Sequence, residues 1–82
     1  MKLSPLPPVP QSYFVVMIDY GHRGREAIVD PEVTRRDVVA RLVSREYDNV
    51  LFIHHVTADA IPQDVTLELQ LEASALSMRE AA

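Results

Sequence analysis

Two runs of apolar residues predict the central strands of this chain. In residues 13–20 both alternating sets of positions are apolar, which is typical of a strand covered on its two faces. Residues 50–57 show the same pattern. Residues 25–29 predict a shorter edge strand, and the loop before it contains two glycines, which favour a hairpin turn. We therefore expect a sheet built around residues 13–20.

A helix is predicted from Thr34 to about Tyr47. Thr34 and Asp37 have the spacing of a capping box, in which each side chain accepts a hydrogen bond from the backbone amide of the other residue. Apolar residues then recur at the spacings found on the buried side of a helix. These residues are Val38, Val39, Leu42 and Val43.

The last segment fits two structures. Apolar and polar residues alternate strictly from Val65 to Glu72, which is the pattern of a strand. The same segment is rich in strong helix formers, and residues 67–82 contain neither glycine nor proline. Asp64 is also a suitable N-cap. We predict a helix here, and a strand over residues 64–72 is the alternative.

The order strand, strand, helix, strand, helix predicts a single α+β domain over residues 12–80. A right-handed crossover after the second strand places the third strand beside the first. The sheet is then three-stranded, mainly antiparallel, in the order 2-1-3, and is packed by two helices. If both helices cover one face, the other is left partly bare, and a bare apolar face marks an interface. Residues 1–11 are rich in proline, and we expect a disordered tail there.

Length and composition narrow the class of protein. With 82 residues the chain allows one domain with a thin core. It has no cysteine, which excludes disulfides and thiolate metal sites and fits a reducing compartment. Self-association is the support that remains. We see no signal peptide and no apolar run long enough to span a bilayer, so we expect a cytoplasmic protein with no membrane partner.

Charge is unevenly placed along the chain. The net charge of −4 argues against a protein whose main task is to hold nucleic acid. Residues 21–48 carry six arginines and six acidic residues, whereas residues 49–82 carry one arginine and five acidic residues. We expect the arginine-bearing middle and the acidic end to complement each other, within one chain or between two.

Residues 30–72 contain a succession of short motifs. They are TRRDVV at the start of the predicted helix, REYDNV at its exit and DVT at the entry to the last segment. In these motifs the chain resembles small uncharacterised proteins of alphaproteobacteria and their phages. The resemblance implies no activity, so it assigns no functional residues.

Two histidines stand side by side at His54 and His55. Adjacent residues of a strand point to opposite faces, so these two cannot chelate one ion together. The chain lacks the spacings of zinc sites, and we expect no metal. It also lacks a serine in a nucleophile motif, so we predict neither enzymatic activity nor a cofactor. His22 and His55 would form an acid–base set with Asp19 only if the fold brought them together.

Basic residues define two candidate binding sites. His22, Arg23 and Arg25 accompany glycines in the hairpin loop, where amides and guanidinium groups can hold a phosphate or a carboxylate. Arg35 and Arg36 lie at the start of a helix, whose free amides attract anions. The four arginines together would suit nucleic-acid phosphates, but the net charge and the lack of alternating aromatics oppose this function. Solvated arginines on a turn and a helix are the simpler interpretation.

Our leading hypothesis is a small, non-enzymatic interaction or adaptor protein that self-associates as a homodimer. It would bury the sheet face or edge against a second copy or another protein. The residues expected in this interface are Val15, Met17, Phe52, Leu69 and Leu76. A nucleic-acid accessory factor using the four arginines is the second hypothesis. A small-ligand or enzymatic module around His22 and His55 is the third.

Overall fold

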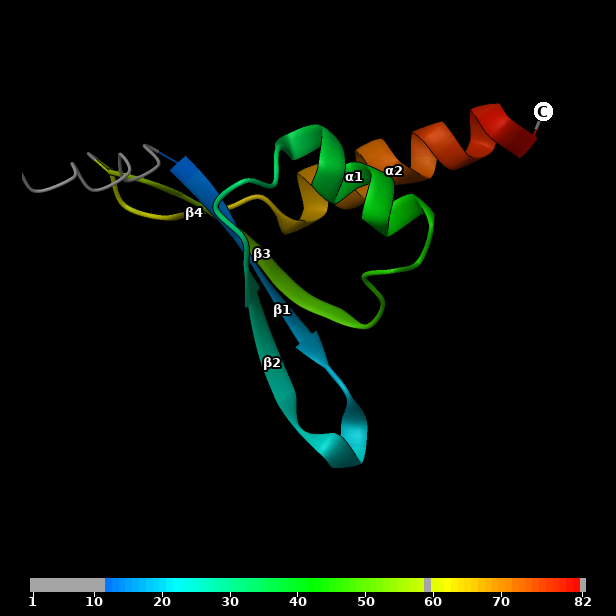
Figure 1. The fold of residues 1–82 in the computed structure, drawn as a ribbon. Helices are drawn as coiled ribbons and strands as arrows, with labels where there is room; N and C mark the ends of the chain where they lie inside the picture. Colours follow the sequence, from blue (N-terminus) through cyan, green and yellow to red (C-terminus); the bar gives the residue numbers. More distant parts are fainter. Residues whose placement is uncertain (1–11, 59, 82) are drawn as a thin grey trace, which may run out of the picture.

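The computed structural model describes residues 12–58 and 60–81, which form one sheet and two helices (Figure 1). The strands are β1 (Ser12–Asp19), β2 (Arg25–Val29), β3 (Val50–Thr57) and β4 (Gln63–Asp64). The helices are α1 (Arg35–Val43) and α2 (Thr66–Ala81), and a short 3-10 turn (Gly21–Arg23) joins β1 to β2. The tail expected at residues 1–11 lies outside the described residues.

The sheet has the strand order β2-β1-β3-β4, and all neighbouring strands are antiparallel. The predicted α+β class, the two helices and the order of the first three strands are confirmed. The prediction of three strands is wrong, because β4 adds a fourth beside β3. β4 pairs only Asp64 with His54 and Gln63 with His55. Two residues are too few to produce a periodic signal, so the sequence does not reveal this strand.

The core lies between one face of the sheet and the two helices, which cover the same side of it (Figure 1). Alternate residues of β1 reach into this core, and β3 adds Ile53, which is fully buried. The buried residues are Phe14, Val16, Ile18, Val38, Val39, Tyr47, Ile53, Val65, Leu69 and Ala73. The other set of β1 side chains therefore points away from both helices.

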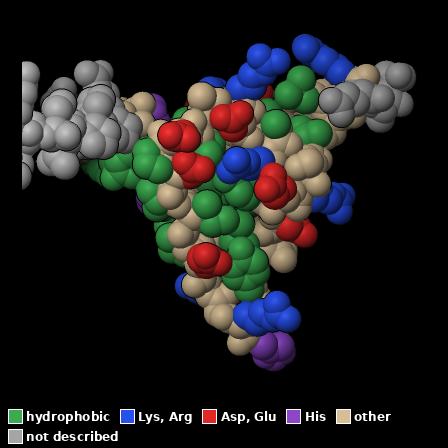
Figure 2. Space-filling view, viewed as in Figure 1, with side chains coloured by type: hydrophobic (Ala, Val, Ile, Leu, Met, Phe, Trp, Pro, Cys, Tyr) green, Lys and Arg blue, Asp and Glu red, His purple; other side chains and the backbone are tan. Residues whose placement is uncertain are grey.

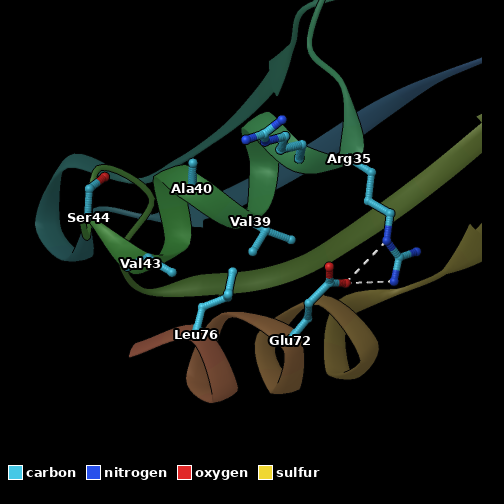
Figure 3. Close-up of a pocket in the computed structure, with 8 residues that line it drawn as sticks. Arg35, Val39, Ala40, Val43, Ser44, Glu72 and Leu76 are labelled. Carbon is cyan, nitrogen blue, oxygen red and sulfur yellow. Dashed lines mark hydrogen bonds and ion pairs between the residues drawn. The ribbon is translucent and has the colours of Figure 1, made fainter. Parts of the chain in front are cut away.

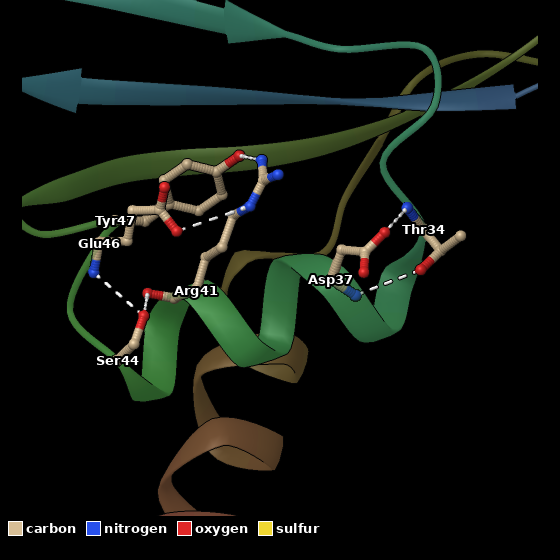
Figure 4. Close-up of polar contacts among 6 residues, drawn as sticks. All are labelled: Thr34, Asp37, Arg41, Ser44, Glu46 and Tyr47. Carbon is tan, nitrogen blue, oxygen red and sulfur yellow. Dashed lines mark hydrogen bonds and ion pairs between the residues drawn. The ribbon is translucent and has the colours of Figure 1, made fainter.

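Helix α1 begins at the predicted capping box (Figure 4). The Thr34 hydroxyl accepts a hydrogen bond from the Asp37 amide at 3.2 Å, and the Asp37 carboxylate accepts one from the Thr34 amide at 3.0 Å. The bond from the Thr34 amide holds the pKa of Asp37 below its ordinary value. A lowered pKa in the folded chain contributes stability above the pKa of the unfolded chain, and this contribution is lost as the pH falls.

We expect Thr34→Ala to lower the free energy of unfolding by about 1 kcal/mol, because the Asp37 amide loses its acceptor. Urea denaturation at a fixed protein concentration measures the difference. Thr34→Ser keeps the hydroxyl and is the matched control, which should stay within about 0.5 kcal/mol of the unmodified chain. Equal stabilities of the alanine and serine variants would contradict this role of the cap.

Helix α1 ends at Val43, earlier than the predicted end near Tyr47. Arg45 adopts a φ of 64°, which a right-handed helix does not allow. The chain turns back at this point, and the Tyr47 ring enters the core. The Tyr47 hydroxyl accepts a hydrogen bond from Arg41 Nη1 at 2.7 Å, and the guanidinium carbon lies 5.5 Å from the ring centroid (Figure 4). Arg41 thereby holds the segment after α1 close to the helix.

Helix α2 confirms the helical interpretation of the last segment, and strand structure is restricted to the two residues of β4. The Asp64 carboxylate stands just before α2 and accepts hydrogen bonds from the hydroxyl and the amide of Thr66, which lower the pKa of Asp64. The Thr66 hydroxyl oxygen also accepts a hydrogen bond from the Ile53 amide at 2.7 Å. These bonds tie the start of α2 to β3.

Candidate interaction surface

The side of the sheet that faces away from the helices carries a continuous set of apolar side chains. The register pairs Met17 with Ala27 on one neighbouring strand and with Phe52 on the other, and paired residues share a face. We define the open sheet face as the apolar residues and the histidine that the register places on this side: Tyr13, Val15, Met17, Ala27, Val29, Phe52, His54 and Val56. The register also places Asp19, Arg25 and Asp64 on this side, at the borders of that set.

Burial along β1 shows that only one face of the sheet has a covering layer. Val16 and Ile18 point to the helices and are 2% and 3% exposed. Val15 and Met17 alternate with them and are only half-buried, although they lie on a central strand. Val29, at the edge of the open sheet face, is 51% exposed. In the described part of the chain, neither helix covers this face (Figure 1).

The two adjacent histidines take different environments on the two faces. The His54 ring stacks on Phe52 within the open sheet face, with centroids 4.2 Å apart and planes at 28°. The His55 ring stacks on Phe14 on the helix side, with centroids 4.6 Å apart. The two rings cannot share one ion. Among residues 12–58 and 60–81, no three histidine or acidic side chains gather in a way that would hold a metal ion.

The structure brings together three of the five residues expected in an interface. Val15, Met17 and Phe52 are neighbours on the open sheet face. Leu69 is fully buried in the core, so it cannot belong to a surface. Leu76 is 37% exposed, but it lies on α2, on the other side of the sheet. Strand alternation predicts which residues of β1 and β3 share a face of the sheet. It does not predict which side of α2 packs against the sheet, so the two leucines of the helix were not grouped correctly with the strand residues.

The basic residues of the two candidate binding sites lie apart. His22, Arg23 and Arg25 belong to the hairpin between β1 and β2, at the lower end of the molecule in Figure 1, where Figure 2 shows basic and histidine side chains at the tip. Arg35 and Arg36 lie at the start of α1, near the other end of β2. His22 is likewise distant from His55, which contacts Phe14 near the start of β1. The fold therefore assembles neither the arginine set nor the histidine set.

Arg35 is engaged by acidic residues of α2 (Figure 3). Its Nε and Nη2 atoms donate to Glu72 Oε2 at 3.2 and 2.8 Å, and Nη2 lies 3.3 Å from Glu68 Oε1. These contacts, first the one with Glu72, raise the pKa of Arg35. The pair joins the arginine-bearing middle to the acidic end within one chain, as the charge distribution predicts. It spans 37 residues, so no short-range pattern in the sequence identifies these partners.

A groove runs between the two helices beside this ion pair (Figure 3). Its volume is about 820 Å³, and it is lined by Arg35, Arg36, Val39, Ala40, Val43, Ser44, Glu72 and Leu76. Its walls are apolar along most of its length, and its one arginine-rich end is partly neutralised by Glu72. No pattern in the sequence identifies this groove, because it depends on how α1 and α2 lie against each other.

Comparisons of the chain with known protein families, with curated proteins and with solved structures find no match in any of the three. Neither helix in the described residues has the combination of length and apolar character that a bilayer crossing requires. Among the described surfaces, the open sheet face is the apolar one that the register of three neighbouring strands defines.

Proposed function

We propose that this is a small, non-enzymatic interaction protein that self-associates through its open sheet face. The observation that carries the proposal is the contrast between the two faces of β1, one buried under helices and one apolar and uncovered. Apolar faces of this kind mark interaction sites on small domains. A second copy of the chain is the partner that is always present. In a twofold dimer the same face is used by both copies, so an apolar face meets an apolar face.

The size of the open sheet face suits a specific interface. The two strands of eight residues are about 26 Å long, β2 with five residues is about 17 Å long, and each strand is about 4.8 Å wide, so the face presents roughly 330 Å² in projection. Two such faces in contact would bury an area at the low end of specific interfaces, which is typical of a reversible dimer. Two such faces stacked about 10 Å apart would make a four-layer assembly with helices outside.

The thin core gives a second physical reason for association. The described core is one cluster of ten buried residues on the helix side of the sheet. Domains of this size bury a smaller share of their surface than larger ones, and without disulfides they gain stability from a partner. We do not extend the proposal to nucleic acid, because Arg23 and Arg25 lie far from Arg35, which is paired with two glutamates.

Sedimentation velocity over a range of concentrations, combined with methyl NMR during dilution, tests the proposal. We expect a species of at least twice the 9.2 kDa chain mass, and dilution shifts in the methyl groups of Val15, Met17 and Val56. The Val38 methyls lie on the buried side of α1, within the core, and serve as the internal control. A mass of one chain at millimolar concentration would overturn the proposal. So would dilution shifts confined to methyl groups outside the open sheet face.

A further inference from the structure

Helix α2 carries two apolar stripes on opposite sides. The first contains Leu69 and Ala73, which face the core, continues to the partly exposed Leu76, and is preceded by the buried Val65 just before the helix. The second consists of Leu67, Leu71, Ala75 and Met78. The second stripe has the same spacing as the first but is shifted by two residues, which turns it by about 200° around the helix. We call it the outer stripe of α2.

The outer stripe is exposed in the described chain. Leu67, Leu71 and Met78 are 68%, 61% and 72% exposed, whereas Leu69 on the core side is 0% exposed. A solvated helix face normally carries polar residues, and a helix that is apolar on two sides is buried on both. Large apolar residues that recur every three or four positions are also the pattern with which helices pair. The outer stripe is therefore a surface that needs a partner.

The charges beside the outer stripe identify that partner. Glu68 and Glu72 flank it near the start of α2, and Arg79 lies on the same flank near the end. Arg35 pairs with both glutamates, so two carboxylates and one guanidinium leave an excess negative charge at the start. A parallel copy of α2 would set like charges against each other. An antiparallel copy places the negative start beside the positive end, twice per contact.

We propose that α2 pairs in antiparallel orientation with α2 of a second copy of this chain, along the outer stripe. A twofold axis between residues 72 and 73 sets Leu67 beside Met78 of the other copy and Glu68 near its Arg79. This contact lies on the helical side of the molecule and does not rest on the proposed role of the open sheet face. Two twofold contacts on different faces would join dimers into tetramers or longer assemblies.

Cysteine cross-linking tests the orientation directly, because the chain contains no cysteine of its own. Leu67→Cys and Met78→Cys both replace exposed side chains, and one of the two proteins carries a mass tag. Antiparallel pairing brings these two positions within disulfide reach, so mild oxidation of the mixture should form the mixed disulfide at least about tenfold faster than either like disulfide. Ser77→Cys in place of Met78→Cys is the matched control, one residue away and turned off the stripe.

Three outcomes would overturn the proposal. Like disulfides in preference to the mixed one would show parallel pairing, and equal rates for the Ser77→Cys control would show random collision. An unchanged rate after Leu71→Glu is added to both proteins would show that the outer stripe is not the contact. The cross-link is also measured with Met17→Glu in both proteins, which removes the open sheet face from the reaction. If α2 pairs independently of the open sheet face, the disulfide between the two α2 helices still forms in this background. The two proposals can therefore be rejected independently of each other.

Discussion

The Met17→Glu variant is expected to remain folded but to lose association through the open sheet face, with the dissociation constant of that contact raised by at least about a thousandfold. Met17 lies in the middle of the open sheet face, between Ala27 and Phe52. Among the described residues neither helix covers this side of the sheet, so a carboxylate at position 17 can reach water in the single chain. In the dimer two such carboxylates, one per copy, would be buried in an apolar layer.

The size of the effect follows from desolvation. Removing a carboxylate from water without a partner costs several kcal/mol per ion, and the twofold symmetry applies this cost twice. A total above about 4 kcal/mol corresponds to a thousandfold change in the dissociation constant. Sedimentation equilibrium measures this constant when Leu71→Glu is present in every protein compared, so that the α2 contact does not contribute, and circular dichroism shows whether the variant is folded.

Ile61→Glu is the matched control for this substitution. Ile61 is 86% exposed in the loop between β3 and β4, so the change adds the same charge outside the open sheet face. We expect its dissociation constant to stay within about tenfold of that of the unmodified chain, since a single exposed charge alters association only modestly. A folded Met17→Glu variant that associates as tightly as Ile61→Glu would exclude the open sheet face as the interface.

The second large effect is expected in the core. Leu69→Ala should lower the free energy of unfolding by about 2–5 kcal/mol, because it removes a fully buried side chain and leaves a cavity. Leu69 belongs to the single core cluster between the helices and the sheet. A loss of this size is a large fraction of the stability that a small domain has, so part of the population should unfold near room temperature.

Leu71→Ala provides the matched comparison on the same helix. Leu71 is 61% exposed, and its truncation should change the free energy of unfolding by no more than about 0.5 kcal/mol in dilute solution. Both variants are compared by urea denaturation at one low protein concentration, because association would couple stability to concentration. Similar losses for Leu69→Ala and Leu71→Ala would mean that α2 does not bury the stripe assigned to the core.

This pair of leucines shows why part of the fold and of the interface was not predictable. The two apolar stripes of α2 have the same spacing, so periodicity alone cannot decide which one faces the sheet. Leu69 was placed in the interface by sequence reasoning and lies in the core. Val15 and Met17 share a face of the sheet, as strand alternation predicts once the strand is identified.

Local signals in the sequence determined β1, β2 and β3, the hairpin, the capping box of α1 and the opposition of His54 and His55, but not β4. Each of these depends on residues a few positions apart, and the backbone geometry relates them directly. Only the tertiary structure decided which face of the sheet stays open, which stripe of α2 is buried, and that Arg35 is paired with Glu72. These outcomes depend on how whole elements pack against each other, which is settled by burial across the domain and not by any short segment.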